Sequence, residues 1–350
     1  MKKLALITGS CGLVGAGCVE IFSKRGFKII GVDNDMRGKF FGPLGSTKKI
    51  KQYLKEKTDY IHYDLDIRNE KDIESLFREY KFDLIIHTAA QPSHDWAGEF
   101  PLVDFKINAY ATLVILENFR KYTPEAVFIF ASTNKVYGDR VNSLPFIEFE
   151  TRFDLPPQHP LYEGIDEKMS IDTTLHSFFG ASKLSADILV QEYGKYFGLK
   201  TASFRCGCIT GGYQAGVEAH GFLSYLVRCT LGGRRYIIYG YKGKQVRDNI
   251  HTFDLADAFY HFYLNPKCGE VYNMGGGRFS NISLLEAISL CEEICKKKLN
   301  VEYSNEARKG DHIWWISNNS KFINNYPSWR LTFKIERIME DIFVFQRETI

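Results

Sequence analysis

The sequence has little of what marks secreted, membrane-spanning or nucleic-acid-binding proteins. It contains only eight cysteines in 350 residues, and neither close pair, 206/208 or 291/295, has the matching second pair that a zinc site needs. No apolar run approaches the roughly 18 residues that cross a bilayer. Its 45 basic and 42 acidic side chains leave a formal net charge of +3, which predicts no electrostatic attraction to nucleic acid or to an anionic membrane.

The amino terminus is basic and then apolar, but its apolar run is too short for a secretion signal. That run covers residues 4–7, and Thr8 and Gly9 follow at once. Together with the sparse cysteines, this predicts a cytoplasmic protein whose cysteines are mostly small buried residues in a reducing compartment. An apolar content of 45% is ample for a large core.

Short apolar segments alternate with helical patterns over the first two thirds of the chain. The strand candidates are residues 3–8, 27–33, 60–63, 84–87, 127–131 and 201–205, and the helical patterns lie around residues 13–24, 70–79, 108–120 and 182–196. Strands joined by helical crossovers form parallel sheets with helices on both faces. The sequence therefore predicts an α/β protein with a Rossmann-type, doubly wound parallel sheet.

The alternation weakens after Arg205, where glycine, aromatic residues and arginine-containing loops take over. We interpret residues 206–350 mainly as a smaller C-terminal lobe that binds substrate over the carboxyl edge of the sheet, where open α/β sheets bind ligands. Residues 1–205 would form the sheet domain, and residues 238–265 are expected to return to it.

A glycine-rich turn joins the first strand candidate to the first helical pattern. Gly9, Gly12 and Gly15 permit a tight turn and a close approach of pyrophosphate to the positive end of the helix. Asp33 ends the second strand, where a carboxylate accepts ribose hydroxyls and repels a 2′-phosphate. Residues 1–205 are therefore predicted to bind NAD rather than NADP, a preference that the nearby Arg37 slightly weakens.

Further motifs follow the later strands in a fixed order. These are Asp66-Ile67-Arg68, the run His87-Thr88-Ala89-Ala90, residues 132–138, and Arg247-Asp248. With the glycine spacing, they resemble the extended short-chain dehydrogenase/reductase family, which acts on nucleotide sugars, over roughly residues 1–320. The resemblance implies that the NAD contacts come from Gly9, Cys11, Gly12, Leu13, Val14, Gly15, Asp33, Asn34, Asp66, Ile67, Ala89, Ala90, Gln91, Asn108, Ala131 and Lys183.

Four segments resemble more narrowly the CDP-paratose (CDP-tyvelose) 2-epimerase subfamily. They are residues 90–95, 133–138, 243–248 and 310–315. This likeness alone implies a CDP-linked sugar as the substrate. No set of His and carboxylate residues has zinc-like spacing, so no metal is expected. The family resemblance implies a substrate site in which Arg247 and Arg308 pair with diphosphate oxygens, as guanidinium groups do. The complete implied set is Ser93, His94, Thr133, Asn134, Cys208, His220, Arg247, Arg308 and Asp311.

One catalytic position departs from the family. Its members hold a sugar hydroxyl with Ser or Thr and remove the proton with the tyrosine of a Y-x-x-x-K motif, while hydride passes to NAD. Thr133 and Lys183 match this pattern, but Phe179 stands at the tyrosine position and has no ionisable proton.

Three explanations for Phe179 remain open. Another group could take the proton, with Tyr162, His176, His94 or a water held by Thr133 as candidates. The chain could instead follow a modified route without tyrosine. It could also bind ligand while being impaired as an enzyme, natively or because a tyrosine was replaced.

The residues after Thr133 favour one reaction class. Asn134 and Lys135 stand where the family's 4,6-dehydratases carry Asp-Glu, so elimination is disfavoured. The resemblance thus implies an NAD-dependent epimerase that oxidises C2 of a CDP-deoxyhexose and re-reduces it. The alternatives are a 4-epimerase or oxidoreductase on a related nucleotide sugar, and a protein that binds NAD or nucleotide sugar without turnover. Residues 108–121 and 179–196 match helices that pair in many family members, which implies a homodimer.

Overall fold

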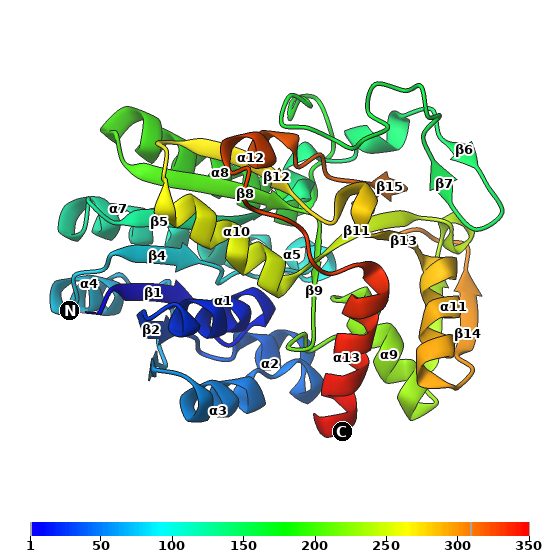
Figure 1. The fold of residues 1–350 in the computed structure, drawn as a ribbon, viewed down its shortest axis with the longest axis horizontal. Helices are drawn as coiled ribbons and strands as arrows, with labels where there is room; N and C mark the ends of the chain where they lie inside the picture. Colours follow the sequence, from blue (N-terminus) through cyan, green and yellow to red (C-terminus); the bar gives the residue numbers. More distant parts are fainter. Residues whose placement is uncertain (1, 309, 350) are drawn as a thin grey trace.

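Seven parallel strands form the central sheet of the computed structural model, which describes residues 2–308 and 310–349 (Figure 1). They are β1 (Leu4–Thr8), β2 (Lys28–Val32), β3 (Tyr60–Tyr63), β4 (Leu84–His87), β5 (Val127–Thr133), β8 (Lys200–Cys206) and β12 (Glu270–Met274). Their order is β12-β8-β5-β4-β1-β2-β3, and every neighbouring pair is parallel. The chain leaves β1 toward β2 and β3 and then crosses to β4 on the other side. This switch point is where doubly wound sheets bind ligands. The predicted fold class is confirmed.

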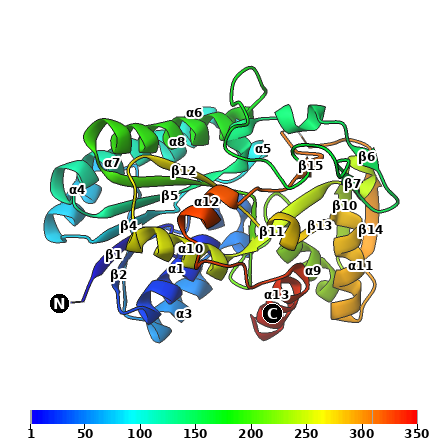
Figure 2. The same ribbon diagram turned by 45° about the horizontal axis from the view of Figure 1, so that its top comes forward.

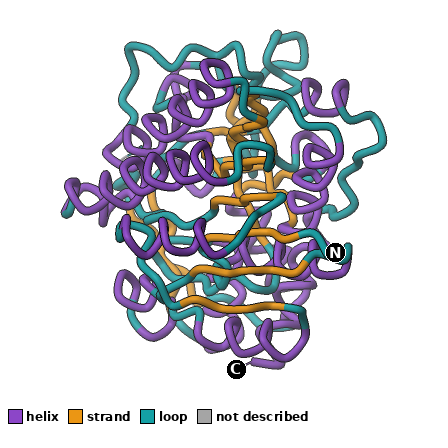
Figure 3. Tube along the Cα trace, turned by 90° about the vertical axis from the view of Figure 1, so that its left-hand side faces the viewer, coloured by secondary structure: helices purple, strands orange, loops and turns teal. Residues whose placement is uncertain are grey.

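Both faces of the sheet are buried, which explains its continuous apolar runs. In β1, Ala5 and Ile7 pack into one cluster with α1 (Leu13–Lys24) and α10 (Thr252–Leu264). Leu6 packs into the other cluster with helices that include α4 (Glu70–Glu79), α7 (Ala111–Tyr122) and α8 (Ser177–Phe197). Figure 2 shows these helices on opposite sides of the strands, and Figure 3 shows helices flanking the strands in a view from the side.

Strand β12 is not among the strands predicted from the sequence, and it lies beyond residues 238–265. Helix α10, within that range, does pack against α1, whereas β10 (Arg235–Tyr239) pairs with β14 (Asn300–Ser304) outside the central sheet. The polar Asn273 interrupts the apolar pattern of β12. Its amide donates to the Ile165 carbonyl at 2.8 Å and accepts from the Tyr137 hydroxyl at 2.8 Å, which satisfies it inside the core. The returning segment therefore extends to Met274.

The remaining elements form the smaller lobe and the surface of the sheet domain. The lobe contains α9 (Phe222–Gly232), α11 (Leu284–Cys295) and α13 (Ile335–Thr349), which share one apolar cluster. Its other strands are β9 (Cys208–Thr210), β11 (Val246–His251), β13 (Asn281–Ser283) and β15 (Trp314–Trp315), with the hairpin β6 (Ile147–Glu148) and β7 (Phe153–Asp154). The shorter helices are α2 (Met36–Phe41), α3 (Lys48–Lys57), α5 (His94–Glu99), α6 (Pro101–Phe105) and α12 (Ser320–Asn325).

Two details of the backbone matter for the site. Helix α8 begins at Ser177, five residues before the predicted helical pattern, so Phe179 and Lys183 lie on its first two turns. A 3-10 turn, Asn134–Tyr137, follows β5 directly. Across residues 2–308 and 310–349, no helix has both the length and the apolar character needed to traverse a bilayer.

Candidate active site

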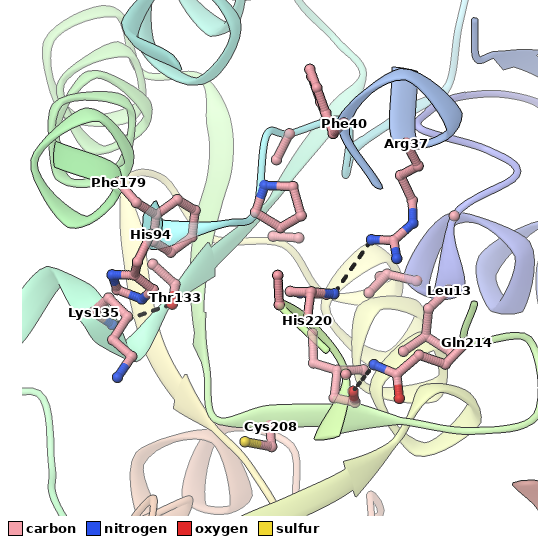
Figure 4. A pocket seen from close by; sticks show the side chains of 18 of the residues that line it. Leu13, Arg37, Phe40, His94, Thr133, Lys135, Phe179, Cys208, Gln214 and His220 are labelled. Atoms are coloured by element: carbon pink, nitrogen blue, oxygen red, sulfur yellow. Dashed lines mark hydrogen bonds between the residues drawn. The ribbon is translucent and has the colours of Figure 1, made fainter. Parts of the chain in front are cut away.

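A cavity of about 500 Å³ opens at the carboxyl edge of the sheet, between the sheet domain and the lobe. Figure 4 shows two of its sides, with His94, Thr133, Lys135 and Phe179 on one and Leu13, Arg37, Gln214 and His220 on the other. Most of the predicted site residues line it: Gly9, Gly12, Leu13, Val14, Asp33, Asn34, Asp66, Ile67, Ala89, Ala90, His94, Ala131, Thr133, Asn134, Phe179, Lys183, Cys208, His220, Arg247, Arg308 and Asp311.

The glycine turn between β1 and α1 is packed so closely that side chains would not fit. Gly9 has a φ of +66°, and a Cβ there would lie 2.7 Å from the Ala89 nitrogen. Gly15 does not line the cavity, but a Cβ on it would lie only 2.1 Å from the Gly9 carbonyl oxygen. Gly15 therefore holds α1 against the turn, while Gly9 and Gly12 present bare backbone to the cavity.

Asp33 is positioned at the end of β2 by two backbone amides. It accepts hydrogen bonds from Cys11 N at 3.0 Å and from Asp35 N at 2.9 Å. Burial raises the pKa of its carboxyl above the ordinary value. Cys11 thus acts through its backbone, and its own thiol is buried away from the cavity beside Tyr60. The Arg37 guanidinium donates to the Ala215 carbonyl at 2.8 Å and lies 3.3 Å from His220 Nδ1.

Asp66 is held in place by Arg68. The guanidinium donates two hydrogen bonds to the carboxylate, at 2.9 and 2.6 Å, and this pairing lowers the pKa of Asp66. Asn34 donates a longer bond to the same carboxylate at 3.3 Å. These polar side chains and the apolar side chain of Ile67 line the same end of the cavity.

Thr133 and Lys183 come from the end of β5 and from α8. The Thr133 hydroxyl accepts from Lys135 N at 3.2 Å, capping the 3-10 turn. The Lys183 ammonium donates to the Ala131 carbonyl at 2.7 Å and lies 3.9 Å from the centroid of the Phe130 ring. Burial lowers the pKa of Lys183 to about 7.

Phe179 packs against the imidazole ring of His94. The two rings meet edge to face, with centroids 5.0 Å apart. His94 Nδ1 lies 2.8 Å from the Ser177 hydroxyl. Burial, reinforced by the charge of Lys135, lowers the pKa of His94 to about 3, so the imidazole is neutral.

Three predicted residues form a buried network behind the cavity instead of lining it. Gln91 donates to the Ser93 carbonyl and to Asp104, both at 2.8 Å. Asn108 accepts from Gln91 N at 2.9 Å and donates to Ser182 at 3.1 Å. Ser93 caps α5 by accepting from Trp96 N. These side chains position the loop that carries His94.

Lys135, Arg247 and Asp311 form a charged cluster on the lobe side. Arg247 donates to the Asp311 carboxylate, and Lys135 Nζ lies 3.9 Å from it. Burial opposes ionisation of Asp311, but the two cations outweigh it and hold the pKa of that carboxyl well below its ordinary value. Burial lowers the pKa of Lys135 to about 8. Its ammonium donates to the Gly310 carbonyl at 2.9 Å.

Arg308 lies on the lobe's rim. Its guanidinium donates to the Glu218 carbonyl at 2.8 Å and lies 4.3 Å from the centroid of the Tyr239 ring. Cys208 also lines the cavity, and burial raises the pKa of its thiol to about 11, which disfavours a nucleophilic thiolate.

Several lining residues escaped sequence analysis because they come from segments without motifs. Phe40 lies on α2, while Tyr225 and Tyr236 come from α9 and β10. No local signal marks them, since their place in the cavity depends on how the lobe packs. Two proposed substitute bases, Tyr162 and His176, do not line the cavity. The Tyr162 ring contacts Arg278, and His176 Nε2 lies 2.8 Å from the Ile171 carbonyl.

The protein is a doubly wound α/β protein with one large cavity. The glycine turn and Asp33 lie at one end of this cavity, the dinucleotide end, and Lys135, Arg247 and Arg308 lie at the other, the cationic end. Residues 5–275 match the model of the NAD dependent epimerase/dehydratase family, so the chain belongs to that family. This agrees with the resemblance found in the motifs, and NAD is accordingly its cofactor.

The chain is also similar to individual relatives over nearly its whole length. It is 30% identical to the CDP-paratose 2-epimerase of Salmonella typhi over 326 residues, which cover 91% of this chain and 92% of that one. A Thermotoga maritima UDP-glucose 4-epimerase solved with UDP-glucose is 25% identical, with a TM-score of 0.77 and 99% of both chains covered. A Thermus thermophilus UDP-glucose 4-epimerase solved with NAD shares the fold at 23% identity, with a TM-score of 0.80, 99% of this chain and all of that chain covered.

Proposed function

We propose that this chain is an NAD-dependent epimerase that inverts C2 of a CDP-linked deoxyhexose by transient oxidation to a keto sugar. One observation carries the proposal. A single cavity is lined by the glycine turn, by Thr133 with Lys183, and by Arg247 with Arg308. The likeness to the CDP-paratose 2-epimerase supports the choice of carbon and nucleotide.

The residues at the dinucleotide end fit NAD. Gly9 and Gly12 present bare backbone to the cavity, and α1 begins directly behind them. Asp33 lines the same end as an acceptor for ribose hydroxyls. In our proposal Asp66 and Ile67 contact adenine, and Lys183 holds the nicotinamide ribose. When bound, NAD supplies a reversible hydride acceptor.

The remaining residues handle the sugar. Thr133 holds the reacting hydroxyl, and the Lys183 charge favours loss of its proton. Epimerisation then requires only that the keto sugar rotate in the site, so that hydride returns to its opposite face. Asn134 and Lys135 provide no acid and base pair for elimination, which separates this site from a 4,6-dehydratase.

The cationic end suits a diphosphate. Arg247 and Arg308 present guanidinium groups that can pair with two oxygens each. Arg247 is already bonded to Asp311, and Lys135 lies beside them. In our proposal the diphosphate shares Arg247 with Asp311, while Asp311 faces the nucleotide ribose.

Two other functions have a specific observation behind them. The solved 4-epimerases with the same fold favour a 4-epimerase or another oxidoreductase on a nucleotide sugar. Phe179 favours a protein that binds NAD and a nucleotide sugar without turnover, because the family's usual proton acceptor is missing.

A homodimer is also part of the proposal. Helices α6 and α8 pack against each other. Leu102 and Phe105 on α6, and Phe178 and Ile188 on α8, expose apolar side chains. A second copy would cover them through paired helices. Sedimentation should then give twice the chain mass, and Ile188→Glu should shift it toward the monomer. A wild-type monomer at micromolar concentration would refute the dimer.

Incubation with CDP-paratose or CDP-tyvelose tests the function directly. We expect NMR of the C2 proton to show both epimers, with NAD regenerated in each turnover. Arg247→Gln should lose binding of CDP-sugar but keep that of NAD. Inversion of UDP-glucose at C4 instead would establish the first alternative. Tight binding of both ligands with no inversion and no NADH absorbance would establish the second.

A further inference from the structure

Phe179 replaces the tyrosine that accepts the proton in other family members. A side chain close to Phe179 is therefore a candidate for a substitute proton acceptor. An oxidation at a sugar carbon must place the hydroxyl proton on some group. Of the side chains considered as substitutes, Tyr162 and His176 do not line the cavity, whereas His94 does. The His94 ring also meets the Phe179 ring edge to face, so it lies directly beside the position that the family's tyrosine occupies.

His94 is held by contacts that leave one ring nitrogen available. Its Nδ1 lies 2.8 Å from the Ser177 hydroxyl. A Cβ at Gly310 would come within 2.9 Å of the same nitrogen, so the loop of Gly310 closes directly over this side of the ring. Neither contact involves Nε2. Figure 4 shows the ring on the same side of the cavity as Thr133 and Lys135, and the charge of Lys135 acts on it.

Ser177 adopts a conformation that its sequence alone would not favour. Its φ is +62°, in the left-handed region that a non-glycine residue rarely occupies. There it begins α8, and its hydroxyl accepts from Gly180 N at 3.3 Å while bonding to His94. Strained backbone of this kind concentrates at functional sites, and here it aligns the imidazole.

We propose that His94 is the proton acceptor of this site, with Nδ1–H donating to Ser177 and Nε2 facing the hydroxyl held by Thr133. The inference rests on the oxidation-based function proposed above. In the forward step the C–H bond breaks and its electron pair leaves as hydride to NAD. The O–H electron pair forms the C=O bond, and the proton passes to Nε2. In the return step the proton goes back to oxygen as hydride adds to the opposite face.

A neutral imidazole can accept the hydroxyl proton in the oxidation step and return it in the reduction step of the same turnover. The titratable groups that act on His94 are Lys135 from the turn after β5, Asp311 from the lobe and His220 from the segment before α9. Burial, reinforced by the charge of Lys135, outweighs Asp311 and keeps the ring neutral. As hydride leaves, the hydroxyl becomes a protonated carbonyl, which is far more acidic than an imidazolium. A weak base therefore accepts this proton and readily returns it.

The two lysines of the site are the rival acceptors. Each amino group donates to a backbone carbonyl, Lys183 to Ala131 and Lys135 to Gly310, so one of its hydrogens is already engaged. The pKa of Lys183 is about 7 and that of Lys135 about 8, both well above the pKa of about 3 for His94. The pH dependence of the rate therefore distinguishes the lysines from His94. A lysine base would make the rate fall as the pH drops below 8 or 7. With His94 as the base, no such fall appears between pH 8 and 5.

The variant His94→Asn tests the proposal while keeping the hydrogen bond to Ser177. The asparagine amide can still bond Ser177 in place of Nδ1 but has no counterpart of Nε2. We expect turnover to fall by about 10²–10⁴-fold, with the Kd for NAD unchanged by calorimetry. His261→Asn, on α10 away from the cavity, is the matched control and should keep full activity.

A second variant separates lost chemistry from lost structure. In a His94→Ala background, Phe179→Tyr restores a phenol one helical turn from Lys183 and should recover at least about tenfold of the lost turnover. Near wild-type turnover in His94→Asn, no recovery in the double variant, or a wild-type rate that falls below pH 7–8 would each overturn the assignment.

Failure of the proposed function is distinguishable from failure of this inference. If the wild-type chain epimerises no nucleotide sugar, the proposed function is refuted. The His94 assignment is then decided by ¹⁵N NMR of the imidazole at pH 7. Protonated Nδ1 with unprotonated Nε2 supports it, and the opposite tautomer or a doubly protonated ring overturns it.

Discussion

Replacing Lys183 by methionine should stabilise the protein at neutral pH even as it weakens the site. Lys183 is almost fully buried, and burial lowers its pKa from the ordinary 10.5 to about 7. In the unfolded chain the same ammonium is solvated and keeps its ordinary pKa. The folded state therefore binds this proton less tightly than the unfolded state.

The size and sign of the effect follow from the two pKa values. Below pH 7 the group is protonated in both states, and burying the charge costs about 5 kcal/mol. As the pH rises from 7 to 10.5 the unfolded chain still holds the proton while the folded chain has lost it, so stability increases with pH. Above 10.5 both forms are neutral and the penalty disappears. The stabilisation by Lys183→Met should therefore shrink by about 3 kcal/mol between pH 6 and pH 9.

Urea unfolding at pH 6, 7.5 and 9, without NAD, measures this difference. Lys195→Met is the matched control, because Lys195 lies exposed on the same helix. Its effect on the free energy of unfolding should not vary in this way. A Lys183→Met advantage that is constant across the three pH values, or that grows toward pH 9, would refute the reasoning.

Two further perturbations address the dinucleotide end. Gly15→Ala puts a Cβ 2.1 Å from the Gly9 carbonyl oxygen, so the turn must move by about 1 Å and NAD should bind about 10²-fold more weakly. Gly98→Ala, where no atom lies within 4 Å, should leave the Kd unchanged, and equal Kd values for the two variants would contradict this account. Asp33→Asn removes the charge that repels a 2′-phosphate, so the ratio of NADP to NAD affinity should rise about tenfold. A ratio that stays at its wild-type value in fluorescence titrations would show that Asp33 does not face the ribose.

Much of the sheet domain could be predicted because its signals are local. The strands 60–63 and 84–87 and the helices 13–24 and 70–79 have the bounds expected from their apolar patterns. Strand β12 escaped because Asn273 is polar yet buried, and only the carbonyl of Ile165 and the hydroxyl of Tyr137 make that burial favourable. A residue satisfied by partners more than 100 positions away leaves no pattern in its own segment.

The same distinction separates the two ends of the candidate site. The glycine turn and Asp33 could be recognised from spacing, since a strand, a turn and a helix are consecutive in the chain. Tyr162 and His176 were reasonable substitutes by sequence order, but their side chains contact Arg278 and Ile171 outside the cavity.

The sequence by itself determined the class of fold, the place of the dinucleotide turn and the absence of a tyrosine at position 179. Those properties depend on residue type and on short-range periodicity. Only the tertiary structure decided that His94 meets Phe179, that Ser177 fixes its Nδ1, and that Gly310 closes over it. These residues come from three distant segments, and their contacts arise from the packing of the lobe and of α8 against the sheet domain, which no local pattern encodes.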